Sequence, residues 1–305
     1  MAVYLRDWGL VLKSIDLYRK GQIEQAIETY KKSTEKIQEL ADMWDMDFDM
    51  VCDLTHNGSA EHKWWNGPYC GIFHSRDSSA PFLGIAFKGT DPRNYKDWLV
   101  DLKYATVKAS PGILYGTNVS EGVYNGLFGH FKDGRPFDMV LRAINDLLTT
   151  KPNITEEPAM IHATGHSLGG SYSSLCFLQL TEPDSRPSKA SIGDLYTFGA
   201  PRNGLKDLAT AAKDALGSST GSTWRIANVA DGIPKVPPVI KRDYEPFNHI
   251  DAGWSISPSA APQEIPSEIG TTPPPHFPTL AEWKGHAPWE YHKAMKEALV
   301  TKGDT

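Results

Sequence analysis

The pentapeptide GHSLG at residues 165–169 stands between an apolar run at 158–164 and a second run, 168–180, that begins with small side chains. The first run is typical of a buried strand, and the second of a helix whose first turn leaves room for close backbone contacts. A strand, a sharp turn and a helix in this order form a nucleophile elbow, which presents the serine hydroxyl at the edge of a sheet. The pattern therefore predicts that Ser167 is a nucleophile. The alternative is a tight turn with a solvent-facing serine.

Length and composition limit what kind of chain this is. The 305 residues are 40% hydrophobic and 22% charged, which suits a globular chain with a large core. The formal net charge is −6 and no run of Lys and Arg occurs, so nucleic acid is not an expected partner. No apolar run is long enough to span a bilayer, and the first residues lack the features of a signal peptide. The sequence as written predicts a cytoplasmic protein, or a secreted one if a leader has been removed.

Cysteine usage adds little. Cys52, Cys70 and Cys176 make an odd number, so they cannot all pair with one another. Cys176 lies on the helix expected after the elbow and is interpreted as a small core residue. A disulfide between Cys52 and Cys70 stays open.

The hydrophobic pattern divides the chain into an N-terminal helical part and an α/β part. Apolar residues recur at helical spacing over 4–40 and are interrupted at Gly21, which predicts a helical pair. Beyond it, strands are expected to alternate with helices. The expected strands are 69–73, 82–87, 158–164, 192–198, 223–229 and 247–256, and the expected helices are 136–149, 168–180, 204–216 and 289–299.

This alternation predicts an α/β fold with a mostly parallel central sheet and helices on both faces. No linker interrupts the sequence, so a single domain is expected over 1–305, with 1–60 as a helical extension packed on it. The segment 257–280 contains seven prolines and is expected to be a surface loop.

A serine hydroxyl attacks only when a base removes its proton and an acid orients that base. After a nucleophile elbow, the acid and then the base follow along the chain. Asp231 directly follows the strand expected at 223–229 and precedes Gly-Ile-Pro, which does not continue a strand. We therefore expect Asp231 to be the acid. The other candidates lie within an expected strand, on an expected helix or in weaker contexts: Asp194, Asp207, Asp214, Asp243 and Asp251.

Four histidines follow Asp231 and could act as the base. His249 lies within an expected strand, where a histidine is usually structural, while His276 lies in the proline-rich segment and His292 within the last helix. His286 lies in the loop just before that helix, from which an imidazole can reach a serine. We therefore expect His286 to be the base.

The reaction also needs hydrogen-bond donors for the oxyanion of the tetrahedral intermediate. The backbone N–H of Leu168, directly after the serine, is one expected donor. The second should come from a loop after another central strand, and Thr90 follows the strand expected at 82–87.

Five blocks of sequence carry a family resemblance. They are FKGT at 87–90 with DWLVDL at 97–102, GHSLGG at 165–170, YTFGAPR at 196–202, NVADGIPKVPP at 228–238, and His286 followed by Tyr291. Together they resemble the block motifs of the fungal class 3 lipase family, in the same order. His249, with Gly253 after it, resembles that family's non-catalytic strand histidine.

The resemblance implies an α/β-hydrolase fold and hydrolysis of carboxylic esters through an acyl-enzyme intermediate. Carried over by position, it implies Ser167 as nucleophile, Asp231 as acid, His286 as base, and Thr90 and Leu168 as oxyanion donors. The expected partner is a small-molecule or lipid ester, and no cofactor or metal is expected.

The substrate class stays open among acylglycerols, phospholipids and hydroxycinnamoyl (feruloyl-type) esters, because pocket shape decides it. A non-catalytic binding module on the same fold is the alternative to an enzyme, and the presence of all three triad residues argues against it. The segment 91–102 resembles the lid of secreted family members but carries five charged residues. Its contact with a lipid surface is therefore expected to be weak and transient.

Overall fold

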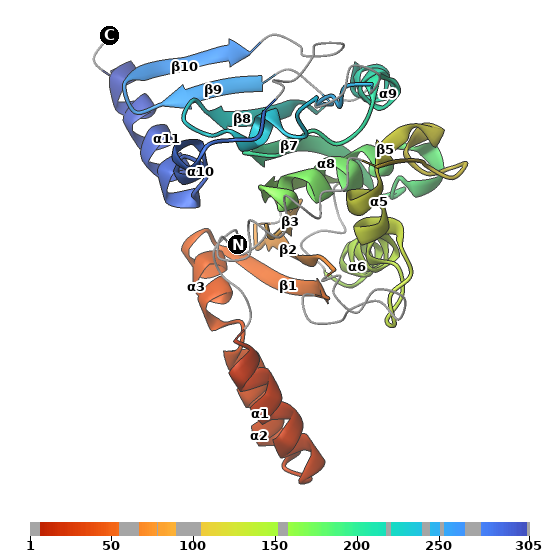
Figure 1. Ribbon diagram of the computed structural model, residues 1–305. Helices are drawn as coiled ribbons and strands as arrows, with labels where there is room; N and C mark the ends of the chain where they lie inside the picture. The colour runs from red at the N-terminus through yellow and green to blue at the C-terminus, as the bar shows by residue number, and fades with distance from the viewer. Residues whose placement is uncertain are drawn as a thin grey trace.

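The computed structural model describes residues 7–54, 67–77, 79–89, 105–151, 158–217, 221–239, 245–250, 253–265 and 276–303. Within these residues, an eight-stranded sheet with the order β1-β2-β3-β6-β7-β8-β9-β10 forms the centre of the molecule (Figure 1). Its strands are β1 (Met46–Asp53), β2 (Tyr69–Ser75), β3 (Phe82–Phe87), β6 (Ala159–His166), β7 (Ala190–Phe198), β8 (Thr223–Asn228), β9 (Gly253–Ser257) and β10 (Ala260–Ile265).

The five inner strands from β3 to β9 run parallel, and antiparallel pairs close the sheet at both ends. The expected mostly parallel sheet is confirmed. A separate two-stranded sheet joins β4 (Thr106–Lys108) to β5 (Asn118–Ser120), and the sequence pattern did not predict it.

Helices cover both faces of the large sheet, as expected. On one face α8 (Leu168–Thr181) packs against β3, β6 and β7. The core of this face also takes in α5 (Glu121–Phe128), α6 (Pro136–Thr150) and α9 (Lys206–Gly217). On the other face α3 (Glu35–Met43) covers the β1 end, and α11 (Pro288–Gly303), preceded by α10 (Leu280–Lys284), covers the β8–β10 end. None of the helices in the described part of the chain is both long and apolar enough to cross a bilayer.

The N-terminal part contains the expected helical pair, α1 (Trp8–Arg19) and α2 (Ile23–Lys32), joined at Gly21. The pattern that continued to residue 40 does not form one helix with α2, because α3 is separate. The break lies at Ser33 and Thr34, whose hydroxyls donate to the carbonyls of Tyr30 and Lys31 and so compete with helix continuation. The α1–α2 pair projects from the body, and only α3 lies on the sheet (Figure 1).

Two expectations near the C-terminus are wrong in part. The strand expected at 247–256 starts only at Gly253, since residues 247–250 make a single bridge between Asn248 and Gly204. The segment 257–280, expected to be a surface loop, contributes β10 to the sheet, paired with β9 around a turn at 258–259. Pro262 is tolerated there because β10 is an edge strand, which leaves one row of N–H groups unpaired.

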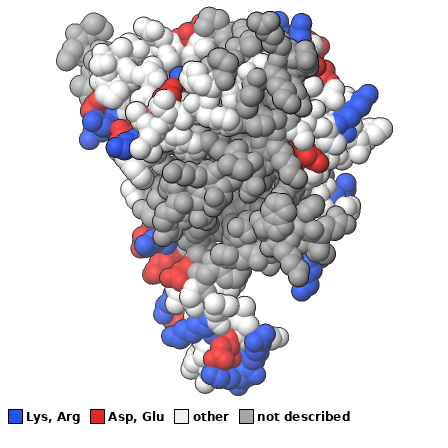
Figure 2. Space-filling view, in the orientation of Figure 1, with Lys and Arg blue, Asp and Glu red and all other residues white. Residues whose placement is uncertain are grey.

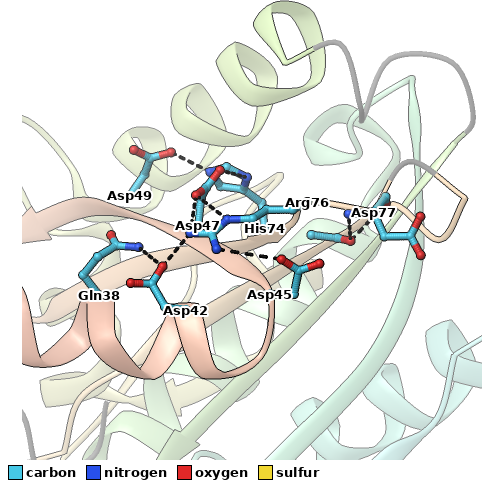
Figure 3. A network of polar contacts seen from close by, with 9 residues as sticks. Gln38, Asp42, Asp45, Asp47, Asp49, His74, Arg76 and Asp77 are labelled. Atoms are coloured by element: carbon cyan, nitrogen blue, oxygen red, sulfur yellow. Dashed lines mark hydrogen bonds and ion pairs between the residues drawn. The ribbon is translucent and has the colours of Figure 1, made fainter.

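A polar network fastens α3 and β1 to β2 (Figure 3). The guanidinium of Arg76, just after β2, lies 2.6 Å from the Asp42 carboxylate of α3 and 2.8 Å from that of Asp47 in β1. The His74 imidazole of β2 bonds Asp49 of β1 at 3.0 Å. Hydrogen bonds from Arg76 and from His74 hold the pKa values of Asp42 and Asp49 below their usual range. The network therefore ties the N-terminal part to the edge of the sheet.

Buried thiols lie under this edge. Cys52 and Cys70 face each other across β1 and β2, and Cys176 lies in α8. All three are buried and free. Cys176 is a core residue, as expected.

Candidate active site

Ser167 occupies the turn between β6 and α8 with an unusual backbone. Its φ of 60° and ψ of −131° fall in a backbone region that residues other than glycine rarely adopt. The Ser167 N–H donates to the carbonyl of Phe198 at the end of β7 over 2.9 Å, which holds the strained turn on the sheet. The residue is 1% exposed, and its hydroxyl has no hydrogen-bond partner among the described residues. This geometry is that of a nucleophile elbow.

The glycines of the pentapeptide make the turn sterically feasible. A Cβ on Gly165 would collide with the backbone of Gly169, and a Cβ on Gly169 would collide with the carbonyl of Phe87 at the end of β3. Both residues therefore allow the start of α8 to lie directly against the strand ends.

Asp231 and His286 form a buried pair at the same edge of the sheet. Asp231 follows β8, and its Oδ2 lies 2.7 Å from Nδ1 of His286. The same oxygen accepts a hydrogen bond of 2.6 Å from the hydroxyl of Tyr291, while Oδ1 accepts one of 2.8 Å from the backbone N–H of Ile233. Both members are nearly fully buried, Asp231 at 2% and His286 at 4% exposure. The carboxylate thus fixes one ring nitrogen of His286 and leaves Nε2 on the far side of the ring.

Several contacts fasten the segment that carries His286 to the segment that carries Asp231. The N–H of Gly232 donates to the carbonyl of Glu282, and the Asn228 side chain donates to the carbonyl of Gly285. Lys235 pairs with the Glu282 carboxylate at 3.0 Å. Glu282 also closes the capping box of α10, and the backbone N–H of Thr279, with Lys235, lowers its pKa to about 2. The loop histidine is therefore held in place by a short, capped helix.

His166, inside the pentapeptide, contacts the same histidine. Its ring lies 4.5 Å from that of His286, centroid to centroid, and its Nε2 lies 2.8 Å from the His286 carbonyl. Burial, with a smaller contribution from the neighbouring His286, lowers the pKa of His166 to about 3. His166 is therefore neutral near pH 7, and its Nε2–H donates to the carbonyl. It joins the elbow directly to the His286 loop.

Gly199 marks where these groups meet. It has a φ of 61°, and a Cβ placed on it would lie 2.8 Å from Asp231 Oδ2, 2.8 Å from the Tyr291 hydroxyl and 3.0 Å from His286 Cε1. The preceding residue, Phe198, accepts the N–H of Ser167. One strand end thus touches the elbow on one side and the Asp231–His286 pair on the other.

The expected oxyanion donors are described only in part. Leu168 is the first residue of α8, so its N–H belongs to the free donors of a helix N-terminus beside Ser167. Thr90 and the segment 91–102 lie outside the described residues. Their neighbour Gly89 lies at the elbow, since a Cβ on it would be 3.1 Å from Ser167 Cβ.

The other candidate histidines lie elsewhere. His249 is buried, and its Nε2 bonds the carbonyl of Pro234 at 2.7 Å. Burial and the nearby cations Arg225 and Arg202 hold its pKa well below the usual range. His276 and His292 are exposed. Among the described residues, no group of His, Cys, Asp or Glu is arranged to hold a metal ion.

Sequence reasoning assigned no role to Tyr291, Gly199 or His166. Tyr291 stood within a recognised block, yet its bond to Asp231 depends on how α11 packs on the sheet. A glycine directly after an expected strand permits a positive φ, which Gly199 has, but the sequence does not say what the position contacts. No sequence signal indicates the contact between His166 and His286, which are 120 positions apart.

The chain is similar to known lipases. The family model for class 3 lipases matches residues 84–241, just over half of the chain. The chain belongs to the class 3 lipase family. A lipase of Rhizomucor miehei is 27% identical over 189 residues, covering 61% of this chain and 46% of the relative. A triacylglycerol lipase of Arabidopsis thaliana is 27% identical over 190 residues, covering 54% of this chain and 36% of the relative. The chain thus matches less than half the length of either relative.

Solved lipase structures share the fold. A triacylglycerol lipase from Penicillium expansum superposes with a TM-score of 0.52 at 18% identity, covering 72% of this chain and 74% of that one. A lipase from Rhizopus microsporus var. chinensis gives 0.52 at 20% identity, covering 78% and 73%. These likenesses confirm the expected α/β-hydrolase fold.

Proposed function

We propose that this chain is a lipase-like serine hydrolase of carboxylic esters, with Ser167 as nucleophile, His286 as base and Asp231 as acid. The observation that carries the proposal is the buried 2.7 Å bond between Asp231 and His286, at the sheet edge where Ser167 has its strained turn. Membership of the class 3 lipase family and the lipase names of the relatives support it.

In the first half of the reaction, Nε2 of His286 takes the proton of the Ser167 hydroxyl as Oγ attacks the ester carbonyl. Asp231 keeps Nδ1 protonated and stabilises the imidazolium that forms. The carbonyl oxygen becomes an oxyanion, which accepts the N–H of Leu168 and the donors of Thr90. The tetrahedral intermediate then expels the alcohol, which takes its proton from His286, and leaves an acyl group on Ser167.

In the second half, His286 removes a proton from water as the water attacks the acyl-enzyme. A second tetrahedral intermediate collapses, the carboxylic acid leaves, and the proton returns to Ser167. The roles of Tyr291 and His166 in this scheme are to position the acid and the base, because neither touches the reacting atoms.

The direct test is the variant Ser167→Ala, assayed on p-nitrophenyl butyrate. We expect kcat to fall by roughly 10⁴ to 10⁶ with the fold retained, because only oxyanion and binding effects remain. Ser173→Ala is the matched control on α8, since the Ser173 hydroxyl bonds the Gly170 carbonyl and no other group among the described residues. Near wild-type turnover by Ser167→Ala would overturn the mechanism.

The preferred substrates are proposed to be soluble or short-to-medium-chain esters, because the charged segment 91–102 is poorly suited to inserting into lipid. A chain-length series of p-nitrophenyl esters, triacylglycerol emulsions and methyl ferulate tests this. A steep rise in rate once an emulsion forms would contradict it and indicate an interfacial lipase whose lid moves. High turnover of methyl ferulate alone would assign a feruloyl-type esterase.

A further inference from the structure

The α1–α2 hairpin exposes large apolar side chains that the described rest of the chain leaves uncovered. It projects beyond the body at the lower end of the molecule in Figures 1 and 2. Leu12 is 62% exposed, Ile27 is 52% exposed, and Tyr18 at the tip is 65% exposed. Three more large side chains on the two helices are exposed, and the full list is Leu12, Ile15, Tyr18, Ile23, Ile27 and Tyr30.

Most of these side chains share one face of the hairpin. Val11 and Ser14 of α1 and Ala26 of α2 are buried where the two helices meet, and the Ser14 hydroxyl donates to the Ala26 carbonyl at 2.8 Å. When each helix is viewed along its axis from its N-terminus, the exposed residues lie on the same side of these buried positions in both helices. On α1 they are Leu12 and Ile15, directly after Val11 and Ser14, and on α2 they are Ile23, Ile27 and Tyr30.

The two helices run antiparallel, because the N–H of Asp7 before α1 donates to the carbonyl of Ser33 after α2. In an antiparallel pair, side chains on the same rotational side of the interface fall on the same face. The hairpin therefore has one apolar face, made by Leu12, Ile15, Ile23, Ile27 and Tyr30. A contiguous apolar face on an exposed element marks an interaction surface.

The charge of the hairpin differs from that of the whole chain. Over residues 8–32 five basic residues face three acidic ones, in a chain whose net charge is −6. Lys20 and Lys32 are paired with Asp16 and Glu28 within their own helices. Arg19 lies four positions after Ile15 and Lys31 four after Ile27, so both lie beside the apolar face on their helices. Neither makes an ion pair among the described residues. An apolar face edged by such cations is complementary to a lipid surface with negative headgroups, where long cationic side chains reach the charge while their stems stay apolar.

A second copy of the chain is a poorer fit to this face. Two helices of 12 and 10 residues offer a face about 18 Å long and about 20 Å wide, or roughly 360 Å². A stable protein complex buries about 800 Å² on each partner. Insertion into a lipid interface has no such minimum area, and Tyr18 and Tyr30 have the amphipathic rings that such interfaces favour.

We propose that the α1–α2 hairpin docks this protein on an anionic lipid surface. The side chains of the apolar face enter the interface, and Arg19 and Lys31 contact the headgroups. The docking element lies outside the triad, so it can bind whether or not Ser167 acts on an ester. It adds a membrane contact that does not depend on the segment 91–102.

The test is flotation of the full chain with vesicles, in the Ser167→Ala background so that no lipid is hydrolysed. The two vesicle types are phosphatidylcholine alone and phosphatidylcholine containing phosphatidylserine. We expect binding to the second, and a loss of about tenfold or more for the double variant Ile15→Glu, Ile27→Glu. The matched control, Gln22→Glu with Gln25→Glu, adds the same charge to exposed positions away from the apolar face and should lose far less.

A second pair of substitutions tests the headgroup contact. Arg19→Gln with Lys31→Gln should weaken binding to phosphatidylserine vesicles by about fivefold per charge and leave the weaker binding to phosphatidylcholine unchanged. Circular dichroism, and hydrolysis of p-nitrophenyl butyrate where Ser167 is intact, check that each variant is folded. Vesicle binding by the chain with Ser167 intact, without any hydrolysis of p-nitrophenyl butyrate, would refute the proposed function and leave the docking proposal standing.

Three outcomes would overturn the docking proposal. One is no flotation with phosphatidylserine vesicles. Another is an equal loss of binding in the Ile15→Glu, Ile27→Glu variant and in its control, Gln22→Glu with Gln25→Glu. The third is a dimer in sedimentation equilibrium that the isoleucine variant makes monomeric, because the face would then join two copies of the chain.

Discussion

Helix α8 and the α1–α2 hairpin invert the usual rule for burial in opposite ways. α8 buries every residue from Gly169 to Thr181, including Ser171, Ser173, Ser174 and Gln179. The hairpin leaves Leu12 and Ile27 more than half exposed. Polar side chains are inside in one region and apolar side chains are outside in the other.

The difference is explained by what surrounds each region. In α8 the Ser173 and Ser174 hydroxyls donate to the Gly170 carbonyl, and Gln179 bonds the Leu114 N–H and the Ser185 hydroxyl. Burial of these three side chains is therefore offset by hydrogen bonds, whereas the Ser171 hydroxyl has no partner among the described residues. The small serines let the helix approach the sheet behind Ser167. The apolar face of the hairpin, by contrast, stays exposed, with Leu12 at 62% and Ile27 at 52%. We infer that the side chains of α8 make their contacts within the fold and that the apolar face of the hairpin contacts an external surface.

The largest expected effect is on catalysis at the α8 end. His286→Ala should lower kcat on p-nitrophenyl butyrate by about 10⁴ or more, because the triad acts as a unit. His249→Ala should instead cost about 1–3 kcal/mol of stability, since it leaves the buried Pro234 carbonyl without its donor. Kinetics and thermal melts of both variants separate the roles, and the reverse pattern would show that the base has been misassigned.

Core substitution contrasts the two regions directly. Phe177→Ala in α8 should lower the free energy of unfolding by about 3–5 kcal/mol, because the side chain is completely buried and leaves a cavity. Ile27→Ala on the hairpin should change it by less than about 0.5 kcal/mol. Urea unfolding measures both, and similar losses would mean that the hairpin is packed in solution.

Acid pH tests the packing around the elbow. The pKa of His166 is lowered to about 3 in the folded chain, whereas an unfolded histidine titrates near pH 6.5. The free energy of unfolding is therefore highest above pH 6.5 and falls as pH decreases toward 3, by up to about 1.4 kcal/mol per pH unit. The reason is that the unfolded chain binds a proton at His166 that the folded chain does not.

The measurement is urea unfolding between pH 7 and pH 4.5, with His166→Asn as the variant. Its stability should depend less on pH than that of the parent. His292→Asn, at an exposed site, is the control and should follow the parent. An unchanged slope for His166→Asn would refute the idea that His166 is held neutral by burial.

The smallest effect concerns the position of the acid. Tyr291→Phe removes one hydrogen bond to Asp231 and should lower kcat about three- to tenfold, with KM nearly unchanged. A drop as large as that of His286→Ala would mean that Tyr291 takes part in the chemistry itself.

Local signals predicted the parts of the site that depend on neighbouring residues. The glycines around Ser167 and the strand before it specify the elbow within a dozen residues. Chain order and loop position then selected Asp231 and His286, which the structure brings to 2.7 Å. Their catalytic roles stay a prediction.

Other features depend on packing between distant segments and left no periodic signal. The contacts of Tyr291 and His166 join residues 60 and 120 positions apart. β10 lies in a proline-containing stretch, which is typical of a loop. A strand still forms there because an edge strand needs backbone hydrogen bonds on one side only. The helical pair was evident from its spacing, but the spacing does not say what covers its apolar side.

The central claim is that Ser167 is the nucleophile, and covalent labelling tests it most directly. The chain is treated with a p-nitrophenyl alkylphosphonate, and the adduct is located by intact-mass measurement and peptide mapping. We predict one adduct per chain, on the peptide that contains Ser167, with activity lost in step with labelling and no adduct on Ser167→Ala. An adduct on another residue, or ester hydrolysis that persists in the fully labelled chain, would contradict the account.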